Sequence, residues 1–132
     1  MGATLTIWHW LVIGFGGGLG AMARFATVTW INRQHVSSFP WGTFTVNVVG
    51  SFIMGLAFVL FTIKYPQVPG TWRSFVLVGT LGAFTTFSSF ALESLSLLQQ
   101  QNIPLALMYM VASVVVCLIA VTVGFQLGKF IL

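Results

Sequence analysis

Residues 79–90, GTLGAFTTFSSF, combine the side chains that could line a path for an ion. They hold two glycines, three threonines, two serines and three phenylalanines, inside a stretch otherwise long and apolar enough to cross a bilayer. Irregular backbone is found at that depth only where it is buried in protein or lines a cavity. Gly79 and Gly82 favour a break in the helix, and Thr85 and Thr86 place hydroxyls beside it. Broken membrane helices of this kind are typical of ion pathways, so we expect function here.

Two phenylalanines follow the predicted break. Phe87 and Phe90 are three residues apart, so their rings should project from one side of the half-helix. Phenyl rings in membrane helices usually only pack. Beside a hydroxyl-rich break, however, their electropositive edges could replace part of the hydration shell of an anion.

Polar residues also recur at helical spacing in two other segments. Thr43, Asn47 and Ser51 are four residues apart and should share one helix face, as should Ser113 and Cys117. An amide in hydrocarbon needs hydrogen bonds, and such groups often only join helices. Two polar tracks favour a lined pathway over isolated contacts between helices.

Two charged residues lie within the apolar segments. Arg24 is near the end of the first, where it could draw or hold an anion or simply reach the headgroups. Glu93 is the only acidic residue of the chain and lies near the helical face of Phe87 and Phe90. It could serve an anion or water vestibule, or couple protons in a cation exporter.

The composition predicts an all-α membrane protein. Hydrophobic residues make up 58% of the 132 residues and charged residues 5%, which excludes an ordinary soluble domain. Each of four spans exceeds the roughly 20 residues that cross the hydrocarbon core; they cover about 5–31, 41–63, 72–98 and 105–131. The five Lys and Arg residues are scattered at span ends, so the basic charge does not indicate a nucleic-acid partner.

The short connections predict one compact transmembrane domain, residues 1–132, with antiparallel neighbouring helices. Glycines four residues apart in the first span should allow close helix or subunit packing; they pair as Gly14 with Gly18 and Gly16 with Gly20. A phosphate-binding glycine loop is the alternative, but it requires a preceding strand. Four helices enclose little interior, so we expect self-association.

The Lys and Arg residues are nearly balanced between the two ends. Lys64, Arg73 and Lys129 fall on one side, against Arg33 and Arg24 on the other. Because the difference in Lys and Arg number between the two sides sets the orientation of a membrane protein, a chain with so small a difference could insert in either orientation.

These segments together resemble the Fluc (CrcB) fluoride channels. The string GTLGAFTTFSSF is similar to the family's Gly-x-x-Thr-Thr-Phe-Ser-x-Phe signature in a third span. The resemblance extends to the glycine-rich first span ending in Arg24, the Pro-Trp-Gly-Thr start of the second span (40–43), and Asn47 followed by Gly50. Glu93, Tyr109 and Ser113 also fit, so the resemblance covers essentially the whole chain.

The resemblance implies an antiparallel, dual-topology homodimer in the inner (plasma) membrane of a bacterium, with two pores that let fluoride out passively. It implies a structural, non-transported sodium ion on the dimer axis, held by the backbone carbonyls of Gly82 and Thr85. Phe87 and Phe90 would be pore-facing rings, Asn47 a pore-lining amide and Ser113 part of the polar track.

Two residues depart from the family pattern. Ala83 stands where a second glycine is common. Cys117 stands where relatives have a hydroxyl, and a thiol is a weaker donor.

Two other functions are considered. A small dual-topology, proton-coupled multidrug exporter would also have four spans, but its glutamate would lie in the first span, where this chain has Arg24. The second is a structural membrane subunit with no transport of its own, and the polar tracks argue against it without excluding it. No catalytic residues are expected.

Overall fold

The computed structural model describes residues 5–132, and every regular element in that range is a helix. Four helices are long and apolar enough to cross a membrane: Ile7–Gln34, Trp41–Lys64, Gly70–Gln99 and Ile103–Ile131. They confirm the predicted all-α fold and its four spans. The largest difference is at the end of the first helix, which was expected near residue 31 and lies at Gln34.

Two of the four helices are α-helical throughout, α1 (Ile7–Gln34) and α6 (Ile103–Ile131). The second helix, α2 (Trp41–Val59), starts directly after Pro40, where a fixed φ suits a helix start, and ends in a π-helical turn, Leu60–Lys64. Connections between the long helices are short, so neighbouring helices run antiparallel.

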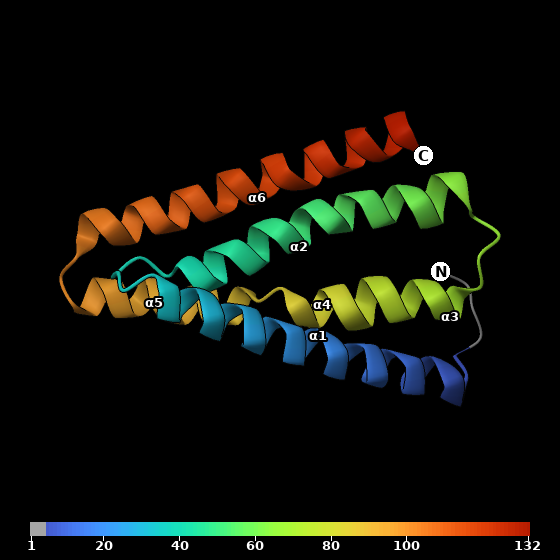
Figure 1. Ribbon diagram of the computed structural model, residues 1–132, viewed down its shortest axis with the longest axis horizontal. Coiled ribbons are helices and arrows are strands. Elements are labelled where there is room, and N and C mark those ends of the chain that lie inside the picture. Colours follow the sequence, from blue (N-terminus) through green and yellow to red (C-terminus); the bar gives the residue numbers. More distant parts are fainter. Residues whose placement is uncertain (1–4) are drawn as a thin grey trace.

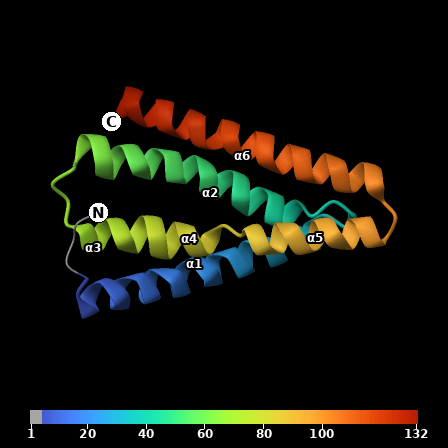
Figure 2. The same cartoon turned by 180° about the vertical axis from the view of Figure 1, so that it is seen from behind.

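The third long helix is a composite, which we call the third helix (residues 70–99). It consists of α3 (Gly70–Arg73), a π-helical segment (Ser74–Leu81), α4 (Gly82–Phe84) and, after a break, α5 (Phe87–Gln99). In Figures 1 and 2 these pieces follow one line across the molecule, so the break interrupts the helix without reversing its direction.

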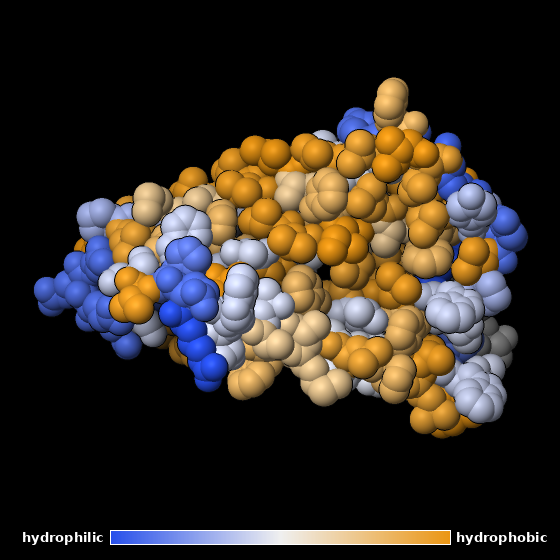
Figure 3. Space-filling view, viewed as in Figure 1, coloured by the Kyte–Doolittle hydropathy of each residue, from blue (hydrophilic) through white to orange (hydrophobic). Residues whose placement is uncertain are grey.

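The helices form a layered bundle in which the third helix lies between α1 and α2, and α6 lies along the other side of α2 (Figures 1 and 2). Helix α1 begins and α6 ends at the same end of the bundle. On the face seen in Figure 3, hydrophobic residues cover most of the middle and hydrophilic residues gather toward the two ends. This distribution is that of a protein surrounded by lipid.

Close backbone contacts hold α1 against the third helix. Gly16 and Gly20 are buried; a Cβ on Gly16 would lie 2.7 Å from the Phe75 carbonyl oxygen, and one on Gly20 would clash with the Thr80 carbonyl. By contrast, a Cβ on Gly14 or Gly18 would meet nothing within 4 Å among the described residues. Of the two predicted glycine pairs, only the second packs two helices of this chain together.

Small residues also bring α2 and α6 together. A Cβ on Gly55 would clash with the Val121 carbonyl, and one on Gly124 with the Phe52 carbonyl. Such small residues allow helices to approach closely in lipid, where dispersion contacts replace the hydrophobic effect. This contact fixes α2 and α6 as one wall of the site described below.

The break in the third helix lies at Thr85 and Thr86, not at the glycines. Thr85 has φ −87° and ψ 159°, and Thr86 has φ −152° and ψ 114°, whereas Gly82 is helical at φ −60° and ψ −36°. The prediction that Gly79 and Gly82 break the helix was therefore wrong. Gly79 instead packs against α1, where a Cβ would lie 2.9 Å from the Ile13 carbonyl oxygen.

Candidate functional site

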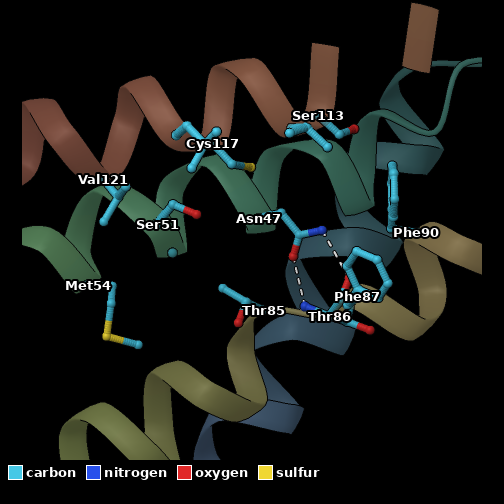
Figure 4. Close-up of a pocket in the computed structure, with 13 residues that line it drawn as sticks. Asn47, Ser51, Met54, Thr85, Thr86, Phe87, Phe90, Ser113, Cys117 and Val121 are labelled. Carbon is cyan, nitrogen blue, oxygen red and sulfur yellow. Dashed lines mark hydrogen bonds between the residues drawn. The ribbon is translucent and has the colours of Figure 1, made fainter. Parts of the chain in front are cut away.

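A groove of about 400 Å³ opens on one side of the bundle, between α2, α6 and the break. Figure 4 shows its polar and aromatic side chains. It is lined by Asn47, Gly50, Ser51, Met54, Thr85, Thr86, Phe87, Phe90, Ser113, Val114, Cys117, Leu118 and Val121. These residues include no charged side chain, and eight of them were expected in a pathway, in its polar tracks or beside the break: Asn47, Ser51, Thr85, Thr86, Phe87, Phe90, Ser113 and Cys117.

Asn47 joins α2 to the break through two hydrogen bonds. Its Nδ2 donates to the Thr86 carbonyl at 3.0 Å, and its Oδ1 accepts from the Thr86 N–H at 2.7 Å (Figure 4). The backbone N–H can only donate, which fixes the orientation of the amide. Since Nδ2 carries two hydrogens and one is used, the second remains to be donated to a ligand in the groove.

Thr86 then starts the second half of the helix. Its Oγ1 accepts from the Ser89 N–H at 3.2 Å, which is the usual N-cap contact. In a continuous α-helix the Thr86 N–H would instead bond to the carbonyl of Gly82. Asn47 therefore deprives the Gly82 carbonyl of its usual donor.

The two rings lie at the groove with different degrees of burial. Phe87 is 77% exposed, whereas Phe90 is half-buried. Their centroids are 5.3 Å apart with ring planes at 48°, and Phe90 is also 5.3 Å from the ring of Tyr109. Phe90 thus belongs both to the groove and to the small core of Leu97, Ala106 and Tyr109.

Ser113 and Cys117 lie one turn apart on α6 and face the groove from the opposite wall (Figure 4). Ser113 is buried, and its hydroxyl has no hydrogen-bond partner among the described residues. Cys117 is half-buried and is a free thiol. Helix α6 therefore offers two hydrogen-bond donors, the Ser113 hydroxyl and the Cys117 thiol. The hydroxyl is the stronger donor, and it has no partner among the described residues.

Thr43 does not reach the groove, although it was expected in one stripe with Asn47 and Ser51. Its Oγ1 donates to Glu93 Oε1 at 2.7 Å, and it is only 2% exposed. Residues four apart on an α-helix differ by about 40° in direction, so the stripe turns away from the groove at its Thr43 end.

Glu93 lies in a cluster of its own, away from the groove lining. Its second oxygen, Oε2, accepts from the hydroxyl of the fully buried Tyr109 at 2.7 Å. Thr43, Glu93 and Tyr109 thus connect α2, α5 and α6. The expected vestibule role of Glu93 stays a prediction, since these contacts are those of a residue that holds helices together.

The remaining predicted residues lie outside the groove or at its edge. Arg24 is half-buried in α1, which contributes no residue to the groove. Thr85 lines the groove, and Gly82 is exposed one turn earlier.

Sequence reasoning missed the apolar part of the groove. Gly50 and Met54 follow Asn47 by three and seven residues. On α6, Val114 and Leu118 directly follow Ser113 and Cys117, and Val121 follows Cys117 by four. The spacing of the polar stripes, continued along each helix, would have found Gly50, Met54 and Val121 but not Val114 and Leu118, which lie about 100° around α6 from the polar residues.

Comparison with known proteins bears on this arrangement. Residues 11–125 match the family model described as CrcB-like protein, Camphor Resistance (CrcB). The chain belongs to the CrcB family. The segment that matches the CrcB model contains every residue that lines the groove, and also the Thr43–Glu93–Tyr109 cluster.

Curated CrcB relatives align over nearly their whole lengths. A protein of Magnetococcus marinus named "Fluoride-specific ion channel FluC" is 47% identical over 123 residues, which are 90% of this chain and 96% of the relative. Proteins with the same name from Hahella chejuensis and Saccharophagus degradans are 42% and 44% identical. Those alignments cover 97% and 91% of this chain, and 100% and 89% of the relatives.

Proposed function

We propose that this protein is a subunit of a fluoride-selective channel that lets fluoride leave the cell down its gradient and so reduces fluoride toxicity. The observation that carries the proposal is the groove, which gathers an amide, hydroxyls and phenyl rings around the break and has no charged side chain in its lining. The names of relatives 42–47% identical to this chain support fluoride as the ion.

The chemistry of the groove suits a small, strongly hydrated anion. Such an ion leaves water only where several close donors replace its hydration shell. Here the donors are the second Nδ2 hydrogen of Asn47, the Ser113 hydroxyl and the weaker Cys117 thiol, together with the ring edges of Phe87 and Phe90. With no Lys or Arg beside it, the anion is held weakly enough to move on.

The working unit in this proposal is an antiparallel pair of chains in the bacterial inner membrane. The groove is open on one side, and a second copy would close it; the two-fold symmetry of a pair then gives two pores. The nearly balanced Lys and Arg residues at the two ends support insertion in both orientations.

A structural sodium ion at the axis of the pair is part of the same proposal. Sodium is a hard cation that takes oxygen ligands, and the break would supply backbone carbonyl oxygens. Gly82 would offer a carbonyl that has lost its usual donor to Asn47, and Thr85 would offer one from extended backbone. Bound there, sodium would join the two chains and would not be transported.

Fluoride efflux from sealed vesicles that contain only this protein tests the proposal. We expect efflux without any proton gradient, and no comparable movement of radioactive sodium. Efflux that requires a proton gradient would instead favour the exporter that uses Glu93, and the absence of any fluoride movement would contradict the channel. Labelling of one terminus from both sides of intact cells tests dual topology: two populations are expected, and a single orientation above ~95% contradicts it.

A further inference from the structure

A second groove, of about 530 Å³, lies between the start of α1 and the start of the third helix. Trp8, Leu11 and Phe15 line it from α1, and Thr71, Trp72 and Phe75 from the facing side. It shares no residue with the first groove. Figures 1 and 2 show the two helix starts side by side at the end of the bundle where α6 also ends.

The walls of this groove are aromatic and remain open. Trp8 is 66% exposed, Phe15 67% and Trp72 58%. Phe75 forms the floor between them, with its centroid 6.1 Å from both Phe15 and Trp72. From Trp8 to Phe15 a helix rises about 10 Å, so the groove leads from the headgroup zone, where tryptophan is enriched, into the hydrocarbon.

Every charged side chain at the end of the bundle that bears this groove is positive. Lys64, Arg73 and Lys129 all lie there, and the one acidic residue of the sequence, Glu93, is bonded to Thr43 and Tyr109 near the opposite end. Arg73 directly follows the groove residue Trp72. Its Nη2 donates to the Pro66 and Val68 carbonyls, while its Nε is buried without a partner among the described residues.

This charge distribution argues against a second copy of the chain as the occupant. A parallel copy would bring another cationic end to the groove, and an antiparallel copy would bring the end with Arg33, whose one acidic residue, Glu93, already accepts hydrogen bonds from Thr43 and Tyr109. The cationic surroundings of the groove favour an anionic occupant, and its apolar lining favours an acyl chain.

We propose that the groove binds an anionic glycerophospholipid. One acyl chain lies along the stacked rings of Phe15 and Phe75, and the phosphate lies at the level of the Thr71 hydroxyl and the Arg73 guanidinium, with Lys64 adding to the local potential. Basic residues near a membrane surface attract anionic lipids.

Tryptophan fluorescence of the reconstituted protein tests this proposal directly. Vesicles are made with phosphatidylglycerol or phosphatidylcholine whose acyl chains are identical and brominated near the headgroup. We expect at least twofold stronger quenching by the phosphatidylglycerol at equal mole fraction. The excess should disappear in Trp8→Phe/Trp72→Phe and persist in Trp30→Phe, whose tryptophan lies near the other end of α1.

The headgroup contact is tested with charge-neutral variants. Arg73→Gln should reduce the phosphatidylglycerol excess by half or more. Because Arg73 also holds the 66–68 turn, Lys64→Gln serves as a second variant, and Arg33→Gln at the opposite end is the matched control that should keep the excess.

Equal quenching by the two lipids would overturn the proposal. If neither lipid quenches Trp8 and Trp72, a protein surface covers the groove and the proposal also fails. The assay contains no fluoride, so its outcome is independent of whether the chain is a fluoride channel.

Discussion

Asn47 of α2 and Thr86 of the third helix exchange two hydrogen bonds, with donor–acceptor distances of 3.0 and 2.7 Å. One side chain thereby satisfies both backbone polar groups of a residue that has left the helical ladder. In lipid such groups cannot hydrogen-bond to water, so the break depends on a neighbouring helix for its hydrogen bonds.

Asn47→Ala should therefore destabilise the protein as well as reduce fluoride flux. It leaves the Thr86 N–H and carbonyl unpaired, which costs about 2 kcal/mol or more. Thermal unfolding in detergent and vesicle efflux measure the two effects. Ser51→Ala, which also lies in the groove, should change stability little; equal losses in both variants would contradict this role of Asn47.

The two groove rings should respond differently to loss of aromaticity. Phe87→Ile should cut fluoride flux without loss of stability, because Phe87 is 77% exposed. Phe90→Ile should cut flux and also lower stability by about 1 kcal/mol, because its ring packs on Tyr109. Phe84, which is not part of the groove, is the control and should keep its flux. Unchanged flux in both groove variants would show that the pore lies elsewhere.

The Tyr109–Glu93 contact can be measured by a double-mutant cycle. Tyr109→Phe should lower stability by about 1.5–3 kcal/mol, the range for a hydrogen bond to a charged group. In a Glu93→Ala background the same change should cost much less, because the acceptor is already gone. Tyr65→Phe, an exposed tyrosine, is the control. An equal cost in both backgrounds would mean that packing and not the hydrogen bond makes Tyr109 important.

The glycines of α1 offer a matched pair of substitutions. Gly20→Ala should destabilise the fold by several kcal/mol, since the new methyl group would overlap the Thr80 carbonyl on the adjacent helix. Gly18→Ala adds the same group to the same helix where it meets nothing within 4 Å. It should leave subunit stability unchanged, and a loss confined to self-association would place Gly18 at a contact between copies. Similar unfolding temperatures for both variants would be inconsistent with the helix contact.

Gly82→Val tests the proposed sodium site. A Cβ at Gly82 meets only the Leu77 carbonyl oxygen at 3.6 Å within the chain, so an isolated subunit should accept it. If two copies meet at Gly82 around sodium, the substitution should reduce the dimer fraction on size exclusion and abolish flux. Thr85→Ser keeps the carbonyl and the hydroxyl and should be mild. A stable, conducting Gly82→Val dimer would rule the site out.

The sequence predicted the helices well because length and hydropathy alone decide whether a segment spans a bilayer. It also placed Asn47, Ser113 and Phe87 together, because residues at helical spacing on long helices keep their relative positions. It misplaced the break, since Gly79 is here used for packing and Gly82 stays helical, and the residue that enforces the break, Asn47, comes from another helix.

Thr43 and Glu93 show a second limit of prediction from the sequence. Their hydrogen bond joins residues 50 positions apart in sequence, so no local pattern contains it. Each residue alone looked like part of a pathway, and only the packing of α2, α5 and α6 shows that they bond to each other.

The π-helical segment Ser74–Leu81 gives the third helix a tolerance to changes in chain length. A π-helix closes its hydrogen bonds one residue later than an α-helix does. If one residue were deleted between Arg73 and Gly79, this segment could return to α-helical hydrogen bonding. Gly79 would then still contact α1 in the same orientation. A similar deletion in α6 between Ser113 and Gly124 would rotate one half of that helix by about 100° and separate the groove wall from its contact with α2. Among descendants of this protein, single-residue deletions should therefore collect in residues 74–78 and be absent from the middle of α6.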